Sequence, residues 1–381
     1  MKKILPLSVA ALAFGCGGSA QQSSFDRATP TFESVALEIT NSDSNSSNFD
    51  GTAASDSPDT ETTAPTDGSV ADQCHPHLFV RTHEVVDATN RGLMRILGPL
   101  HRLIPFEPLH RDGSTHVWER VFNGVDYKYT VNKTGDHSFT AQLDVKAADG
   151  AGAFVTIYQA KINRDPSNHD GSGSATLDLG PLAALTNESI SGTLALNFTV
   201  SSTGKTVIFT MDHFTARASV PPRSGHYVFY RVNGKGGTLK FNQDMVLRCT
   251  DGTTTTTTPT GTTPVTAVAR WIDASDGVHF RGDAGATGGQ VPADDKWEGV
   301  TCAQGRDPRE TYWMMKLENP TKVPPVISAQ SSQNTEATAA ACDSIFGPVP
   351  AIDSTANDFD FAAIDFTSDD PLPIPGTTTA A

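Results

Sequence analysis

Residues 138–146 read SFTAQLDVK, and this stretch decides the fold class of the chain. Apolar side chains occupy every second position from Phe139 to Val145, and polar side chains fill the positions between them. Such alternation, with a period of two, is typical of a β-strand that has one face buried and the other in water. The stretch therefore predicts a half-buried strand.

The same alternation recurs on both sides of this stretch. It continues in THVWERVF, VDYKYTV, AFVTIYQAKI, GSATLDL, GTLALNFTV, KTVIFTMDHF, GHYVFYRV and GTLKFNQDMVL. The dipeptides Asn123-Gly124 and Asn233-Gly234 are typical of hairpin turns. About nine strands joined mainly by short connections predict an antiparallel meander.

A helix is predicted before these strands. From His83 to Leu97 the apolar residues recur at helical spacing, and the pattern continues to Ile104. Gly98-Pro99 is expected to end the regular helix. The expected fold is mainly β, of the α+β class, with this helix packed on a large curled antiparallel sheet. The layout resembles the open half-barrels of bacterial lipoprotein carriers, and a closed lipocalin-like barrel is the alternative.

The N-terminus has the features of a secretory signal peptide, because Lys2 and Lys3 precede a short apolar run. That run is too short to cross a hydrocarbon core of about 30 Å as a helix. Its exit, from Leu12 to Cys16, resembles the lipobox of bacterial lipoproteins. The resemblance implies removal of residues 1–15 and modification of the Cys16 thiol with lipid, with acyl chains such as palmitate as a membrane anchor. The expected location is the cell envelope of a Gram-negative-type bacterium, at the periplasmic or surface face of the outer membrane.

Composition divides the mature chain into five parts. Residues 16–73 hold ten acidic residues and one arginine among many Ser, Thr and Asn, and are expected to form a disordered tether. The helix and sheet occupy 74–249, a threonine-rich linker follows at 250–264, and a smaller β-containing segment covers 265–350. The acidic tail 351–381 is expected to be disordered. The smaller segment is either a unit of its own or an extension of the first sheet.

Four cysteines follow Cys16, and an even number in an exported chain predicts two disulfides. Cys74 and Cys249 stand at the two ends of the first body, which in a domain are often close together. A bond between them would leave Cys302 and Cys342 to cross-link the C-terminal segment. A bond from Cys249 to Cys302 is the rival pairing.

Composition and motifs exclude several functions. The net charge of −15 and the absence of a basic stripe make nucleic acid a poor partner. KTG at 133–135 lacks the S-x-x-K that should precede it, and no G-x-S-x-G occurs, so no catalytic residue is expected. The Asp- and Asn-rich loop 163–178 departs from the EF-hand register, and His75 and His77 lack a third ligand at a fixed spacing. Neither a metal nor another cofactor is therefore expected.

These features favour a non-enzymatic envelope lipoprotein whose body binds an apolar ligand or a protein partner. Two other classes stay open: a structural or surface-display lipoprotein without a ligand, and an envelope hydrolase whose residues meet only in space. The nature of a pocket would discriminate between them. A dry cavity indicates binding, a filled core indicates a structural role, and a cleft with paired acids or a Ser–His pair indicates an enzyme.

Overall fold

The computed structural model describes most of the chain after residue 75 and two short pieces before it. The described residues are 25, 35–39, 76–150, 152–164, 170–186, 190–215, 222–245, 247, 262–306, 308–319, 321–322, 326–333, 336–347 and 364–374. Within these ranges, no helix combines the length and the apolar character that a membrane span requires.

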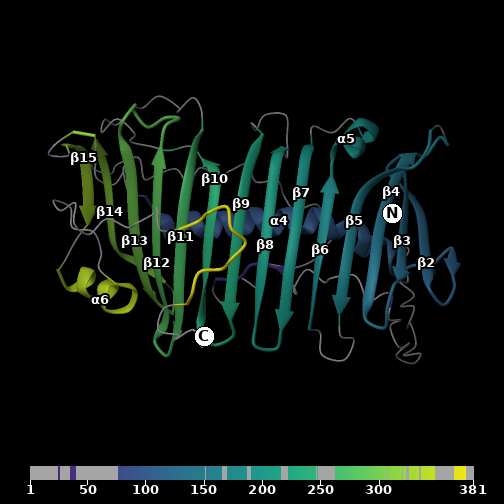
Figure 1. Cartoon of the computed structure of the whole chain (residues 1–381), viewed down its shortest axis with the longest axis horizontal. Helices are drawn as coiled ribbons and strands as arrows, with labels where there is room; N and C mark the ends of the chain where they lie inside the picture. The colour runs from purple at the N-terminus through teal and green to yellow at the C-terminus, as the bar shows by residue number, and fades with distance from the viewer. Residues whose placement is uncertain are drawn as a thin grey trace, which may run out of the picture.

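One antiparallel sheet dominates the described residues, and its strands follow one another in chain order from β1 to β15 (Figure 1). The strands are β1 His110–Arg111, β2 Thr115–Phe122, β3 Val125–Lys133, β4 Ser138–Ala147, β5 Val155–Arg164, β6 Gly171–Asp178, β7 Ser191–Ser201, β8 Gly204–Thr215, β9 Arg223–Val232, β10 Gly236–Met245, β11 Thr263–Ala274, β12 Gly277–Thr287, β13 Lys296–Gly305, β14 Arg309–Asn319 and β15 Val326–Gln333. The short helix α5, Gly180–Thr186, connects β6 to β7. The prediction of a mainly β fold with an antiparallel sheet is confirmed.

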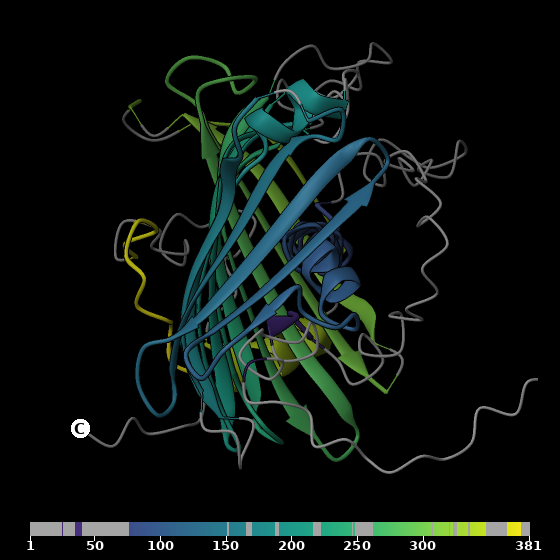
Figure 2. The ribbon, with the colours of Figure 1, turned by 90° about the vertical axis from the view of Figure 1, so that its right-hand side faces the viewer.

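The sheet is open, so the closed barrel is wrong. β1 and β15 lie at opposite edges, and all the other strands lie between them in sequence order. The sheet is also not strongly curled, which corrects the expected half-barrel (Figure 1, Figure 2). Closure is not needed to bury the apolar face, because one long helix, α4, crosses behind the strands along the width of the sheet. A helix of 26 residues is about 39 Å long and spans many strands.

Helix α4, Leu78–Leu103, begins earlier than the sequence pattern predicts and ends close to the last apolar residue of that pattern. It continues through Gly98-Pro99, which was expected to end it. A proline inside a helix costs about 3 kcal/mol. Leu100 and Leu103 are fully buried beyond it, and burying a leucine contributes about 1.5–3 kcal/mol. Packing of these two side chains therefore offsets the cost of the proline.

The two faces of the sheet have different coverings. We call the face against α4 the inner face and the opposite face the outer face. Along β14, Trp313 belongs to the main core on the inner face, while Tyr312 and Met314 belong to a second cluster with helix α6, Glu336–Phe346. The segment 364–374 also lies on the outer face, on the side of the sheet away from α4 (Figure 2).

Two pieces of the expected tether pack beside α4 on the inner face. The side chain of Asn90 donates to the backbone oxygen of Leu37 at 2.9 Å and accepts from its backbone nitrogen at 2.8 Å. The ring of Phe25 stacks on His116 with centroids 3.9 Å apart. For residues 25 and 35–39 the prediction of an unpacked tether is wrong, because their few apolar side chains reach the apolar face of the sheet.

The C-terminal segment extends the first sheet. β11 pairs with β10 along the whole length of β10, from Gly236 opposite Ile272 to Met245 opposite Thr263. This is the alternative in which the segment adds strands across the threonine-rich linker, most of which lies outside the described residues. The two parts share one core, since Trp271 of β11 packs against the main inner cluster.

Part of the expected disordered tail is packed as well. In the segment 364–374, Ile374 is 2% exposed and Phe366 is 8% exposed. For these residues the prediction of disorder is wrong, because apolar side chains between the acidic residues supply enough buried area to hold the segment on the sheet.

Candidate functional site

The outer face is covered at one end of the sheet and open at the other. Helix α6 packs over β13 and β14, and the segment 364–374 contacts β9 and β10. Between β4 and β8, outward side chains such as Gln159, Lys161 and Asn197 are exposed. A shallow depression of about 540 Å³ lies on this open part.

Two rows of outward side chains border the depression. Row A consists of Thr140, Lys161, Ser174, Asn197 and Ile208, one residue from each strand from β4 to β8. Row B consists of Ser138, Asn163, Ser172, Thr199 and Thr206 from the same strands. Neighbours within a row are partners in the strand register, so they lie about 4.8 Å apart across the sheet.

Between rows A and B runs a trough whose floor is backbone. Phe139, Ile162, Gly173 and Phe198 occupy the positions between the rows, and the alternation turns these side chains to the inner face. Gly173 leaves room there for the ring of Phe198, because a Cβ on Gly173 would lie only 2.9 Å from that ring. Four strand spacings make the trough about 19 Å long.

The trough offers many hydrogen-bonding groups and little charge. The hydroxyl groups of Ser and Thr and the amides of Asn both donate and accept. Lys161 carries the one charge among the lining residues, and within the described part of the chain it makes no ion pair. Most of the large apolar side chains of these strands pack toward α4 instead. The lining therefore suits a polar partner better than the apolar ligand that those side chains suggested.

Both rows continue past the trough to β10, where the segment 364–374 crosses over them. Through the register of β8, β9 and β10, Lys240 extends row A and Thr238 extends row B. Lys240 Nζ donates to the backbone oxygen of Asp365 at 2.8 Å. Thr238 Oγ1 donates to the backbone oxygen of Leu372 at 3.0 Å. The chain thus covers both rows at β10 with its own backbone.

Electrostatics favours an acidic segment at this place. Burial lowers the pKa of Lys240, and the carboxylates of Asp365, Asp370 and Asp369 oppose that lowering. His226 of β9 lies beside the same segment, with Nε2 3.5 Å from Oδ1 of Asp369. An ammonium group with three nearby carboxylates is stabilised in its charged form.

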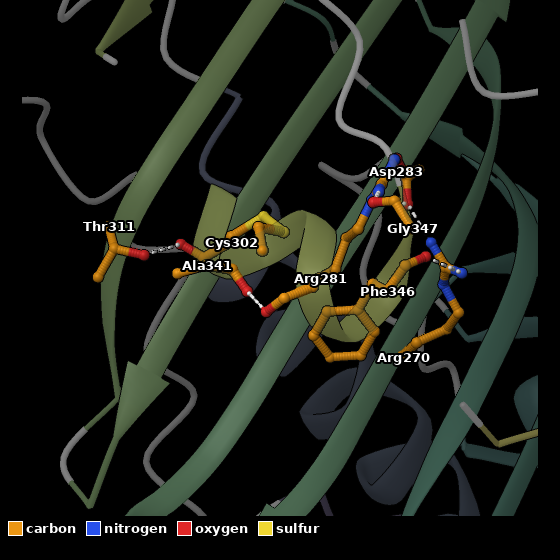
Figure 3. Close-up of a disulfide and its surroundings, with 10 residues drawn as sticks. Arg270, Arg281, Asp283, Cys302, Thr311, Ala341, Phe346 and Gly347 are labelled. Carbon is orange, nitrogen blue, oxygen red and sulfur yellow. Dashed lines mark hydrogen bonds and ion pairs between the residues drawn. A yellow bond between two sulfur atoms is a disulfide. The ribbon is translucent and has the colours of Figure 1, made fainter. Parts of the chain in front are cut away.

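Helix α6 is fastened to the other end of the outer face by a disulfide and an arginine (Figure 3). Cys342 of α6 is bonded to Cys302 of β13, which is the pairing expected for these two cysteines. Arg281 of β12 donates from Nη1 to the backbone oxygen of Gly347, at the C-terminal end of α6, at 2.8 Å. Basic groups at this end of a helix satisfy carbonyls that have no partner within the helix.

A buried carboxylate lies beneath that helix. Asp283 has no exposed area, and Arg281 is 2% exposed. Nε and Nη2 of Arg281 donate to Asp283 at 2.8–3.0 Å, and Nη2 of Arg270 donates to it at 3.1 Å (Figure 3). Burial lowers the pKa of Arg270, while Asp283 opposes that lowering. The cluster joins β11, β12 and α6, and the pair of Arg281 and Asp283 at its centre is buried, so we assign it a structural role.

The other residues singled out in the sequence do not contribute to the trough or to the Asp283 cluster. Cys16, Cys74 and Cys249 lie outside the described residues, so the lipid anchor and the second disulfide stay predictions. His77 precedes α4 and contacts Glu310, with Nδ1 3.2 Å from Oε2. In the described ranges, no group of three or more His, Cys, Asp and Glu residues is arranged to hold a metal ion.

Sequence reasoning did not find the trough. It assigned the outward positions of the strands to solvent, which is correct for each strand alone. The available signal was that Ser, Thr and Asn occupy most of these positions from β4 to β8. The strand register brings these residues into two parallel rows, and only this alignment makes a site of them.

The fold and the trough together define a class of protein. It is an open antiparallel meander with one long helix across its inner face and an uncovered polar trough on its outer face. No protein family model, curated protein or solved structure matches the chain.

Proposed function

We propose that this chain is a non-enzymatic envelope lipoprotein, anchored in a membrane through lipid on Cys16, that binds a polar partner in the outer trough. The observation that carries this proposal is the trough itself. Most side chains of its two rows carry hydroxyl or amide groups, and all of them are at least partly exposed over five strands, while the segment 364–374 lies over the same rows at β10. A sheet with a purely structural role would not require one part of these rows to be exposed and another part to be covered.

The trough can be tested by photocrosslinking in the native envelope. A photoreactive amino acid is placed at Thr199, in row B, and in a control variant at Arg102, an exposed residue of α4. We expect a covalent adduct from position 199 alone. The substitution Ser174→Arg, which places a long side chain in row A, should abolish that adduct. Equal labelling from positions 199 and 102, or labelling that Ser174→Arg leaves unchanged, would contradict a binding role for the trough.

The anchor can be tested separately. Cys16→Ser removes the thiol that the lipid would modify, so we expect the protein to appear in the soluble fraction or to remain unprocessed. Two acyl chains give stable anchoring, so loss of this cysteine should remove nearly all membrane association. Metabolic labelling with a palmitate analogue should mark the wild-type protein only. Unchanged membrane association of the variant would exclude a lipid anchor at this residue.

A further inference from the structure

The chain itself shows one kind of segment that lies over rows A and B. Residues 364–374 read IDFTSDDPLPI and adopt neither helix nor strand. Their contacts with the sheet combine two elements. Lys240 and Thr238 donate to backbone oxygens of the segment, which any sequence could supply, and the carboxylates of the segment favour the charged form of Lys240.

We propose that the trough over β4 to β8 binds an acidic, proline-containing peptide segment of a partner protein. This inference rests on the function proposed above and names the class of the partner. The peptide lies over rows A and B, as 364–374 does at β10. Lys161 attracts its carboxylates, and the hydroxyl groups of row B donate to its backbone oxygens.

The register places equivalent groups in the open and the covered parts of the two rows. Lys161 of β5 and Lys240 of β10 belong to the same row, and Thr199 of β7 and Thr238 of β10 belong to the other. Rows two residues apart on a strand are separated by about 6.6 Å, so a peptide backbone that lies over them can contact side chains of both rows. Each part therefore offers an ammonium group on one side and hydroxyl donors on the other.

The charge of the lining selects an acidic occupant. Lys161 is exposed and, within the described residues, makes no ion pair, whereas no acidic side chain belongs to row A or row B. Prolines in the occupant are compatible with this mode, because the observed contacts use carbonyl oxygens of the segment and proline lacks only the N–H.

The experiment uses the full-length protein and a synthetic peptide with the sequence IDFTSDDPLPI as the probe. Its own tail already covers the two rows at β10, so the added peptide should bind at the open part. Fluorescence anisotropy of the labelled peptide gives the dissociation constant. Lys161→Glu should weaken binding about tenfold or more, since one charge-assisted contact is lost and repulsion replaces it. Lys235→Glu, in the exposed turn between β9 and β10, is the matched control and should leave affinity unchanged.

Further measurements test where the peptide binds and whether its carboxylates are needed. A peptide in which the three Asp residues are replaced by Asn should bind at least several-fold more weakly, and the photoreactive Thr199 variant should form an adduct with the acidic peptide. Equal affinity of the wild-type protein and Lys161→Glu, or an adduct from position 102 instead, would overturn the inference. If position 199 labels an envelope glycan while the peptide does not bind, this inference fails and the proposed function stands. If position 199 labels neither, both fail.

Discussion

Asp283→Ala is expected to destabilise the protein by about 3–5 kcal/mol, because it leaves buried positive charge without its partner. Two guanidinium groups, those of Arg281 and Arg270, donate to the Asp283 carboxylate, which is the shared acidic partner of both. The measurement is the free energy of unfolding in urea, followed for the wild-type protein and the variant under identical conditions.

Asp276→Ala is the matched control for this substitution. Asp276 also pairs with a basic residue on β12, with Oδ1 3.0 Å from Nε2 of His279, but its side chain is 70% exposed. Exposed ion pairs contribute less than about 1 kcal/mol, so the control should lie close to wild type. If the two variants lose similar stability, the Asp283 cluster is not the buried connection between the sheet and α6 that the geometry indicates.

The second large effect concerns the disulfide that holds α6. Replacing both Cys302 and Cys342 by alanine releases a cross-link across 40 residues of chain. In the chain-entropy model a loop of that length gives roughly 4 kcal/mol of stabilisation. We expect the urea midpoint to fall accordingly, and we expect α6 to become the first part of the outer face to exchange its amide hydrogens.

A reducing agent provides the control for this pair. Reduction of the wild-type protein should lower its stability toward that of the double variant. Any further loss when the double variant itself is reduced would report a second disulfide, as predicted for Cys74 and Cys249. A double variant as stable as the oxidised wild-type protein would show that α6 is held without help from the cross-link.

The strands could be predicted from the sequence because each has a local signal. The alternation from Phe139 to Val145 places those side chains on one face whatever the rest of the chain does. The limits of α4 could not be predicted in the same way. Whether Gly98-Pro99 ends the helix depends on whether Leu100 finds a buried place, and the sheet that buries it lies later in the sequence.

The buried charges show a stronger limit on what the local sequence can predict. On β12, alternation alone predicts that Arg281 and Asp283 face water, since Phe280 and Ala284 face the core. Their burial is caused by α6, which is distant in sequence and lies against them only because the chain returns across β13 and β14. The trough has the same origin. Ser174 and Asn197 are ordinary polar positions until the register places them side by side.

The strand order of the sheet has a consequence for how the protein forms. Each strand pairs only with strands adjacent in the chain, so most contacts in the sheet are made between segments close in sequence, and loop closure costs little entropy. The sheet can therefore grow one hairpin at a time onto strands already in place, in the manner of a repeat protein with nearest-neighbour coupling. A chain with this strand order can begin to fold from its N-terminal strands, before its C-terminal strands have been synthesised.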